Sequence, residues 1–258
     1  MELLREPFRR NSQIPPEFKS LGFDRVISYK VGKKREIKVG CYTYNSTPDK
    51  DDYNWVGEDY FLVDERGAVI VMDTASRRER EGNILNTKVF ANEFLNYYFY
   101  FLEKFLPDQA IKLAFKTVWE KEQNVEGLGL KKLGSITEAT FTFVTMVDDN
   151  VYILYVGNTS VVIIKEDGSW DKVTSTEGMV DQPQDGIQQT VVLSSLSNYS
   201  TFLPEDQLPS PGELFKSPKL AIRKVSKGSY VFIFTDGASG PPLALIKTDD
   251  AVVVCMPV

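Results

Sequence analysis

The spacing of apolar residues changes twice along the chain, dividing it into strands, then helices, then strands. Apolar residues recur every three or four positions over residues 84 to about 105 and again over 108–122, which predicts two roughly antiparallel helices that meet at Pro107. Aromatic residues follow one side of the first helix, and we interpret them as a buried face rather than as a site that stacks on a cofactor. These aromatic residues are Phe90, Phe94, Tyr97, Tyr98, Phe101 and Phe105.

Runs of β-branched and aromatic residues predict strands on both sides of the helices. The runs are residues 36–44, 60–63, 68–72, 141–147, 151–156, 161–165, 189–193, 229–235 and 251–256. Residues 64–67 and the Asp167-Gly168 pair are typical of hairpin turns. Strands followed by helices and then by further strands favour antiparallel sheets with helices packed outside them, an α+β fold, over a parallel doubly wound sheet.

The length and composition favour one folded domain. A chain of 258 residues is near the upper size for a single hydrophobic core. Its 42% hydrophobic and 26% charged residues are ordinary for a folded protein and argue against a disordered one. Residues 1–35 are polar and interrupted by prolines, so we expect an irregular N-terminal extension there, followed by the domain at 36–258.

The charge and the cysteine content narrow the class of protein. A net charge of −6 without a contiguous cationic face argues against nucleic-acid binding. Cys41 and Cys255 are too few for a disulfide framework or a structural zinc site, which favours a reducing compartment, with one disulfide as the alternative. No apolar signal core or membrane-length run is present, so we expect a cytoplasmic protein without a membrane partner.

The chain contains no histidine. Its absence excludes serine–histidine and cysteine–histidine catalysis, together with metal sites that use imidazole. Any enzymatic chemistry must therefore come from carboxylates, lysines, arginines, hydroxyls or a metal held by oxygen. Carboxylate oxygens favour hard cations such as Mg²⁺ and Mn²⁺.

Acidic residues stand where four of the predicted strands begin or end. They are Glu58, Asp59, Asp73, Asp236, Asp249 and Asp250. Carboxylates that converge at the rim of a sheet repel one another unless a cation neutralises them. Two divalent ions bridged by one aspartate would satisfy such a cluster and would activate a water for attack on phosphorus. Taken singly, each acidic residue is better explained as a turn former or a solvated strand end, and the functional interpretation rests on their ordered combination.

In combination, these motifs resemble the metal-dependent protein phosphatases of the 2C (PPM) type, from about residue 36 to the C-terminus. The resemblance rests on six segments that occur in the order found in that family. They are Glu58-Asp59, Asp73-Thr74, Gly134-Ser135-Ile136-Thr137-Glu138-Ala139, Val156-Gly157-Asn158-Thr159-Ser160, Thr235-Asp236-Gly237, and Asp249-Asp250 before a valine-rich strand.

The resemblance implies a β-sandwich of two antiparallel sheets flanked by antiparallel helices, with two Mg²⁺ or Mn²⁺ ions at one edge. It implies that Asp73 bridges both ions and that Asp236 and Asp249 ligate one of them. It further implies that the carbonyl of Thr74 contacts the other ion. By the same resemblance, Glu58 and Asp59 hold metal-bound waters. The implied substrate is a phosphoprotein, from which metal-activated water removes a phosphoserine or phosphothreonine phosphate.

The chain departs from the family pattern at residues close to the implied chemistry. Thr74 replaces a glycine, and Asn158 replaces an aspartate associated with a third, weaker metal site. Asn54 stands where the family has its phosphate-binding arginine, so the bidentate guanidinium is missing there. Arg77 or Arg78 is a candidate replacement, and a solvated basic turn is the alternative interpretation of that pair.

Two functional hypotheses follow from these matches and departures. The first is an active metal-dependent serine/threonine phosphatase, supported by the retention of Asp73, Asp236 and Asp249. The second is a weak or inactive relative that uses the same fold as a binding or regulatory module, supported by the changes at Asn54, Thr74 and Asn158. A structural β-protein with aspartates in its turns is a third hypothesis. The substrate, the partner and the oligomeric state are left open.

Overall fold

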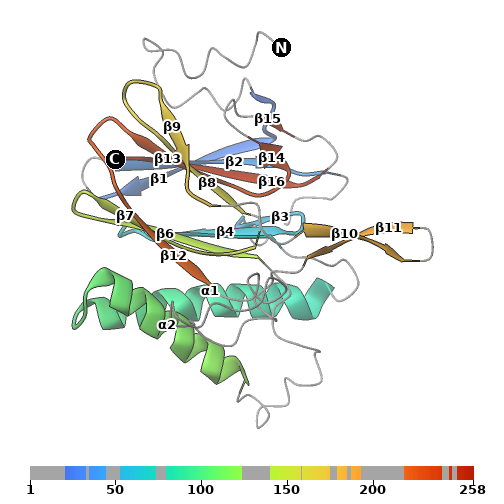
Figure 1. The fold of residues 1–258 in the computed structure, drawn as a ribbon, viewed down its shortest axis with the longest axis horizontal. Helices are drawn as coiled ribbons and strands as arrows, with labels where there is room; N and C mark the ends of the chain where they lie inside the picture. The colour runs from blue at the N-terminus through green and yellow to red at the C-terminus, as the bar shows by residue number, and fades with distance from the viewer. Residues whose placement is uncertain are drawn as a thin grey trace.

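A computed structural model of the chain describes residues 21–32, 35–44, 53–73, 80–123, 140–157, 159–174, 179–184, 187–192, 218–239, 244–245 and 249–258. Two antiparallel sheets of six strands each pack face to face, and two helices cover the outer face of one sheet (Figure 1). This arrangement confirms the predicted α+β sandwich with helices packed outside the sheets.

The first sheet has the strand order β1-β2-β16-β13-β8-β9. Its strands are β1 (Arg25–Val31), β2 (Arg35–Tyr42), β8 (Ser160–Ile164), β9 (Trp170–Lys172), β13 (Tyr230–Phe234) and β16 (Ala251–Pro257). The second sheet has the order β12-β7-β6-β5-β4-β3. Its strands are β3 (Trp55–Val56), β4 (Asp59–Val63), β5 (Val69–Asp73), β6 (Phe141–Val147), β7 (Asn150–Val156) and β12 (Lys219–Lys224).

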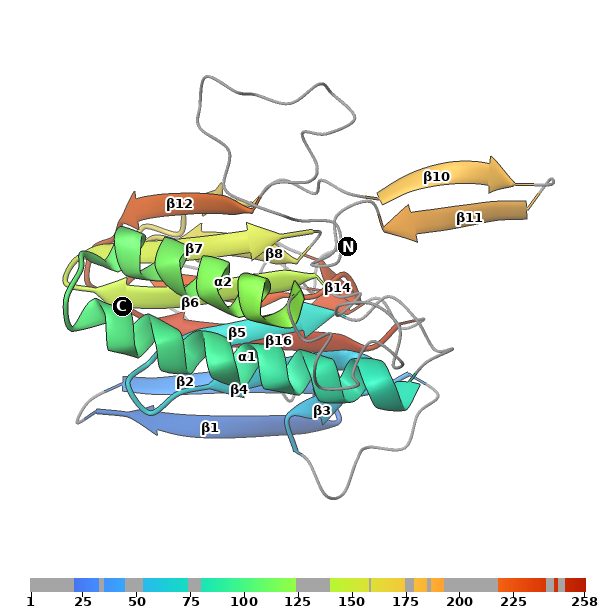
Figure 2. The same cartoon turned by 90° about the horizontal axis from the view of Figure 1, so that it is seen from below.

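The remaining elements lie outside these two sheets. Helices α1 (Arg80–Leu102) and α2 (Pro107–Gln123) are joined by a short turn, and α2 runs back along α1 over the second sheet (Figure 2). Strands β10 (Met179–Gln184) and β11 (Ile187–Val192) form a separate ribbon, as do the short strands β14 (Ala238–Ser239) and β15 (Ala244–Leu245). No helix among the described residues is both long and apolar enough to cross a membrane.

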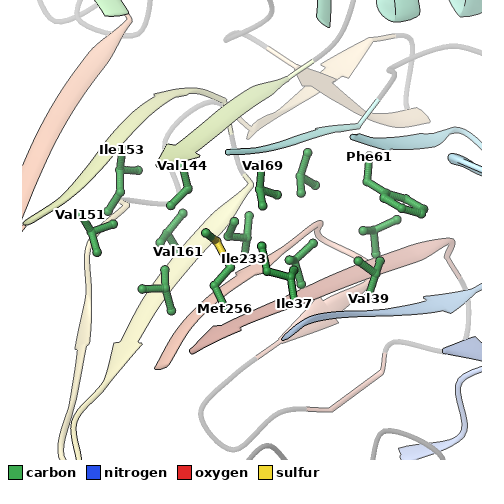
Figure 3. Close-up of a cluster of buried hydrophobic side chains, with 14 of the residues drawn as sticks. Ile37, Val39, Phe61, Val69, Val144, Val151, Ile153, Val161, Ile233 and Met256 are labelled. Carbon is green, nitrogen blue, oxygen red and sulfur yellow. The ribbon is translucent and has the colours of Figure 1, made fainter. Parts of the chain in front are cut away.

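The space between the sheets is filled mainly by valine and isoleucine side chains. In Figure 3, Ile37 and Val39 of β2 face Phe61 of β4 and Val69 of β5. Strand β5 is buried on both faces, because successive side chains point to opposite sides of a strand. Val69 and Val71 therefore belong to the core between the sheets, whereas Ile70 and Met72 belong to the core under the helices. This double burial explains the unbroken apolar run that precedes Asp73.

The core under the helices is aromatic. Phe94 of α1 packs edge-to-face on Phe143 of β6 with ring centroids 4.9 Å apart, and Phe90 lies 5.3 Å from Phe141 in the same way. These contacts confirm the buried aromatic face predicted for the first helix. Phe105 is the exception, because α1 ends at Leu102 and the Phe105 side chain is 44% exposed.

The predicted strands correspond to observed ones. The expectation that residues 1–35 are irregular is wrong in part. Residues 25–31 form strand β1, which pairs with β2 from Arg25↔Cys41 to Val31↔Arg35. The pairing satisfies the β1 backbone and packs alternate apolar residues against the sandwich, so the sheet begins well before residue 36. Residues 1–20 lie outside the described residues, and an extension there stays a prediction. The hairpin at Asp167-Gly168 is confirmed, since it connects β8 to β9 with Gly168 at a φ of 82°.

Candidate functional site

Strand pairing brings the predicted acidic residues to one edge of the sandwich. Asp59 begins β4 and Asp73 ends β5, and the two residues are direct partners in the antiparallel ladder. In the other sheet, β13 pairs with β16. Asp236 lies just beyond the end of β13, and Asp249 and Asp250 lie just before the start of β16. Hydrogen bonds between the two sheets then bring the ends of β4 and β5 close to the ends of β13 and β16.

Asp73, Asp236 and Asp249 form a group that we call the facing aspartates. Burial raises the pKa of Asp73 well above its ordinary value, and the nearby carboxylates of Asp236 and Asp249 raise it further, as does a hydrogen bond with Asp236. Burial and the charge of Asp236 likewise raise the pKa of Asp249, although the side chain lies at the exposed surface.

Asp59 is buried and bonded to a neutral partner from the other sheet. Only 2% of its surface is exposed, and the Thr235 hydroxyl donates a 2.6 Å hydrogen bond to its Oδ2 atom. The same hydroxyl accepts a 3.0 Å hydrogen bond from the backbone N–H of Val252. Burial and the Asp73 carboxylate raise the pKa of Asp59, while the Thr235 hydrogen bond opposes this shift. Thr235 thus fixes one oxygen of Asp59 and connects β4, β13 and β16.

Asp250 holds backbone groups from two other segments. Its Oδ1 atom accepts a 2.6 Å hydrogen bond from the N–H of Tyr44, and its Oδ2 atom accepts a 3.0 Å bond from the N–H of Glu58. Gly57 makes this approach possible: its φ is +60°, and a Cβ atom there would lie 1.8 Å from Oδ2 of Asp250. The two oxygens of Asp250 therefore hold two backbone segments, one at Tyr44 and one at Glu58. Asp59 and Asp250 are called the clamped aspartates below.

The end of β5 is also fixed by hydrogen bonds. The N–H of Asp73 donates to the Thr140 hydroxyl at 3.1 Å, and the N–H of Thr140 donates to the Asp73 carbonyl at 2.8 Å. The Thr140 hydroxyl also lies 2.9 Å from that of Thr159, and both threonines are buried. Asp73 thus extends from a backbone that is tied to the start of β6 and to the turn before β8.

Sequence reasoning missed the roles of Thr235, Asp250 and Thr140. Asp250 stands out in the sequence as one of two acids before the last strand, but the resemblance assigns it no role at the site. Gly57, immediately before Glu58, was a usable signal, because a glycine next to strand-end acids indicates close backbone approach. The two threonines carried no comparable signal, since their partners are distant in the sequence.

Several predicted residues lie outside the site or outside the described residues. Thr74, Arg77, Arg78 and Asn158 are not among the residues that the structure describes. The carbonyl of Asn54 accepts a 3.0 Å hydrogen bond from the N–H of Phe61 in β4, which places residue 54 beside the start of that strand.

The donor set at this edge is compatible in its chemistry with a hard divalent cation. The described candidate ligands are carboxylates, and burial together with the neighbouring carboxylates raises the pKa values of Asp59, Asp73 and Asp249, so a cation here would offset clustered negative charge. Among the described residues, no three His, Cys, Asp or Glu side chains already form a group arranged to hold a metal ion. Asp73, Asp236 and Asp249 are the residues that would hold one.

The fold resembles that of several solved structures, serine/threonine phosphatases among them. PppA, described as a key regulatory component of T6SS in Pseudomonas aeruginosa, superposes with a TM-score of 0.54 at 12% identity, over 90% of this chain and 99% of its own. Serine-threonine phosphatase 2C from Toxoplasma gondii gives a TM-score of 0.53 at 10% identity, over 91% and 99%. The catalytic domain of the serine threonine protein phosphatase PstP, in complex with 2 manganese ions, gives 0.51 at 12%, over 90% and 99%.

The chain therefore has the protein phosphatase 2C-like fold. No protein-family model matches it, and no curated protein matches it in sequence. At identities of 10–12%, these structures establish the architecture, while the activity has to be argued from the residues of this chain.

Proposed function

We propose that the chain is a cytoplasmic metal-dependent serine/threonine phosphoprotein phosphatase, a hydrolase that uses two Mg²⁺ or Mn²⁺ ions. The observation that carries the proposal is the convergence of Asp73, Asp236 and Asp249, with Asp73 hydrogen-bonded to Asp236 and close to the charge of Asp249. When bound, the cations would neutralise these carboxylates and activate a water for attack on phosphorus. The manganese ions in the PstP complex support this assignment by analogy of fold.

The residues have separate roles in this proposal. Asp73, Asp236, Asp249 and the carbonyl of Thr74 would hold the two ions, and Glu58 and Asp59 would orient water at the site. Thr235 donates to Oδ2 of Asp59, which leaves Oδ1 as the oxygen that can accept a hydrogen bond from water. Asp250 holds the N–H of Glu58 and so fixes the backbone from which Glu58 extends.

A second candidate function is a catalytically weak or inactive binding module. It is favoured by Asn54, which offers no guanidinium where the resemblance places a phosphate-binding arginine. The absence of a preformed three-ligand group among the described residues favours it as well. A module of this kind would keep the sandwich fold and bind a phosphoprotein, but it would not hydrolyse the phosphate.

Two measurements test the proposal. The first is hydrolysis of p-nitrophenyl phosphate and of a phosphothreonine peptide, with Mn²⁺ or with a chelator. The second is calorimetric titration of the chain with Mn²⁺. Asp73→Asn and Asp236→Asn should each lower the manganese-dependent kcat/KM by about 100-fold or more, which corresponds to roughly 2.7 kcal/mol of transition-state stabilisation. Asp171→Asn is the matched control, because Asp171 is an exposed aspartate of β9 paired with Lys165. It should leave both readouts unchanged.

The two candidate functions give different outcomes. Manganese-dependent turnover that both substitutions abolish supports the enzyme. Manganese uptake without turnover supports the binding module and overturns the enzyme. A folded chain that neither binds manganese nor hydrolyses phosphate overturns metal-dependent chemistry altogether.

A further inference from the structure

Arg25 occupies an unusual place at the start of β1. It lies opposite Cys41 of β2, and it shares the face of β1 that carries Ile27, Tyr29 and Val31. Those three residues pack on the core between the sheets, and Cys41 is buried in that core. Arg25 therefore points toward the sandwich interior at the end of the strand, and its side chain is partly buried.

The partners that the described residues offer to the Arg25 guanidinium are neutral. Its Nη2 atom donates a 2.7 Å hydrogen bond to the carbonyl of Tyr53 and lies 3.8 Å from Sγ of Cys41. The guanidinium carbon lies 5.7 Å from the centre of the Tyr53 ring. Burial raises the pKa of the Cys41 thiol to about 11, so the thiol is uncharged near neutral pH. In the part of the chain that the structure describes, no ion pair joins Arg25 to a carboxylate.

Within the part of the chain that the structure describes, these contacts engage Nη2, one of the three guanidinium nitrogens. A guanidinium carries five N–H donors in a fixed fork, and its charge is costly to hold away from water without an anion. The carbonyl of Tyr53 and the thiol of Cys41 accept from one nitrogen only. The remaining donors match the paired oxygens of a carboxylate or a phosphate.

Arg25 also belongs to the same edge of the sandwich as the carboxylates. Cys41 is within electrostatic reach of both the Arg25 guanidinium and the Asp59 carboxylate, which shift its pKa in opposite directions. Cys41 pairs with Val252 of β16, and the N–H of Val252 bonds to the hydroxyl that holds Asp59. The hydrogen bond to Tyr53 places the guanidinium beside residue 54, where the arginine expected from the resemblance is an asparagine.

We infer that Arg25 binds the phosphate group of the phosphoserine or phosphothreonine substrate. This inference deepens the proposed function and rests on it for the identity of the ligand. A site lined with carboxylates repels a phosphate dianion, so a cation at its margin strengthens binding. Arg25 supplies that charge from β1 in the first sheet, whereas Asn54 precedes Trp55 of β3 in the second sheet.

The test measures binding of a phosphothreonine peptide and of inorganic phosphate by calorimetry in the presence of Mn²⁺, with the unphosphorylated peptide as a control ligand. Arg25→Gln keeps a hydrogen-bond donor for the Tyr53 carbonyl but removes the charge. It should weaken binding of the phosphorylated peptide by about 10- to 100-fold, and Arg25→Lys should restore part of the loss. Arg223→Ala is the matched control, because Arg223 is an exposed arginine of β12 that donates to the Ile222 carbonyl.

The kinetic readout separates this role from a structural one. If the chain turns over, Arg25→Gln should raise KM by a similar factor, change kcat less, and leave the melting temperature close to that of the unaltered chain. Unchanged affinity for the phosphorylated peptide in Arg25→Gln overturns the inference and leaves the phosphatase proposal standing. If the chain shows no turnover but binds phosphate in a way that depends on Arg25, the inference is supported and the proposed enzymatic activity is overturned. Failure of the unaltered chain to prefer the phosphorylated peptide also overturns the inference.

Discussion

The clamped and the facing aspartates lie at one edge of the sandwich and have the same side-chain chemistry, yet their surroundings differ. Asp59 and Asp250 are buried, and their oxygens accept hydrogen bonds from a hydroxyl and from backbone N–H groups. For Asp73 and Asp249, burial and neighbouring carboxylates raise the pKa values, an environment that Asp59 shares, and Oδ1 of Asp249 accepts a 2.9 Å hydrogen bond from the N–H of Asp250. The contrast is sharpest between Asp249 and Asp250, which are adjacent in the chain: one is exposed and the other nearly buried.

This difference indicates that the two groups of aspartates have separate roles at this edge of the sandwich. A carboxylate whose oxygens accept hydrogen bonds from N–H and O–H groups is held in place by those donors and ties separate segments of the chain together. A carboxylate that meets other carboxylates is stabilised either by a proton or by a cation. We therefore expect changes in the clamped group to alter stability, and changes in the facing group to alter metal binding and the pH dependence of stability.

The largest loss of stability is expected for Gly57→Ala. A Cβ atom at Gly57 would lie 1.8 Å from Oδ2 of Asp250, so the carboxylate would be displaced from both of its N–H donors, and the φ of +60° would add strain. The expected loss in free energy of unfolding is about 4 kcal/mol, measured by urea denaturation. Gly32→Ala is the matched control, because Gly32 has a φ of +59° with nothing within 4 Å of a Cβ atom. It should lose only about 1–2 kcal/mol.

Asp250→Ala should have the next largest effect. It removes the acceptor of both hydrogen bonds, from Tyr44 and Glu58, but adds no backbone strain. We expect a loss of about 3 kcal/mol in free energy of unfolding. The double variant Gly57→Ala/Asp250→Ala should then be more stable than the sum of the two single losses predicts, because the clash has been removed. Strict additivity in this cycle would contradict the clamp.

Thr235→Val should have a smaller effect. The substitution keeps the shape but leaves Oδ2 of Asp59 and the N–H of Val252 without the hydroxyl that serves both. We expect a loss of about 1–3 kcal/mol in thermal or urea unfolding, with a further rise in the pKa of Asp59 because a stabilising hydrogen bond is gone. Thr235→Ser restores the hydroxyl and should recover most of the loss. If Val and Ser variants are equally unstable, packing rather than the hydrogen bond holds this contact.

The smallest effect concerns pH in the absence of metal. The pKa of Asp73 is raised in the folded protein, so between its unfolded and folded values the folded state binds more protons than the unfolded chain. The free energy of unfolding therefore falls as pH rises through that range. In the presence of a chelator, Asp73→Asn should melt a few degrees above the unaltered chain at about pH 8, since roughly 1 kcal/mol corresponds to about 2–4 °C at this size.

Two controls sharpen the pH prediction. The difference between Asp73→Asn and the unaltered chain should shrink at about pH 5, where protonation relieves the same repulsion. It should also shrink when Mn²⁺ is added at about pH 8, because the ion replaces the proton. A difference that is independent of both pH and Mn²⁺ would show that the facing aspartates are not electrostatically strained.

The fold was largely predictable because its elements arise from local spacing. The two helices and the strands that carry Asp59, Asp73 and Asp236 follow from periodicity and turn residues near them in sequence. Strand β1 was not predicted although Ile27, Tyr29 and Val31 alternate with polar residues, because so short a run becomes a strand only where its partner β2 supplies the burial. The acidic strand ends are predictable for the same local reason, whereas no local feature marks Thr235 as a bridge between them.

Sequence alone determined where the chain turns, which residues alternate between core and surface, and that acids stand at the strand ends, since each of these depends on neighbours a few positions away. Tertiary structure decided what each acid does. The Asp250 clamp joins residues 206 positions apart, and the Thr235 contact to Asp59 spans 176. Contacts over such distances exist only after both sheets have formed, because strand pairing and sheet packing set the register that brings their ends together. The position of Arg25 beside this edge was decided in the same way.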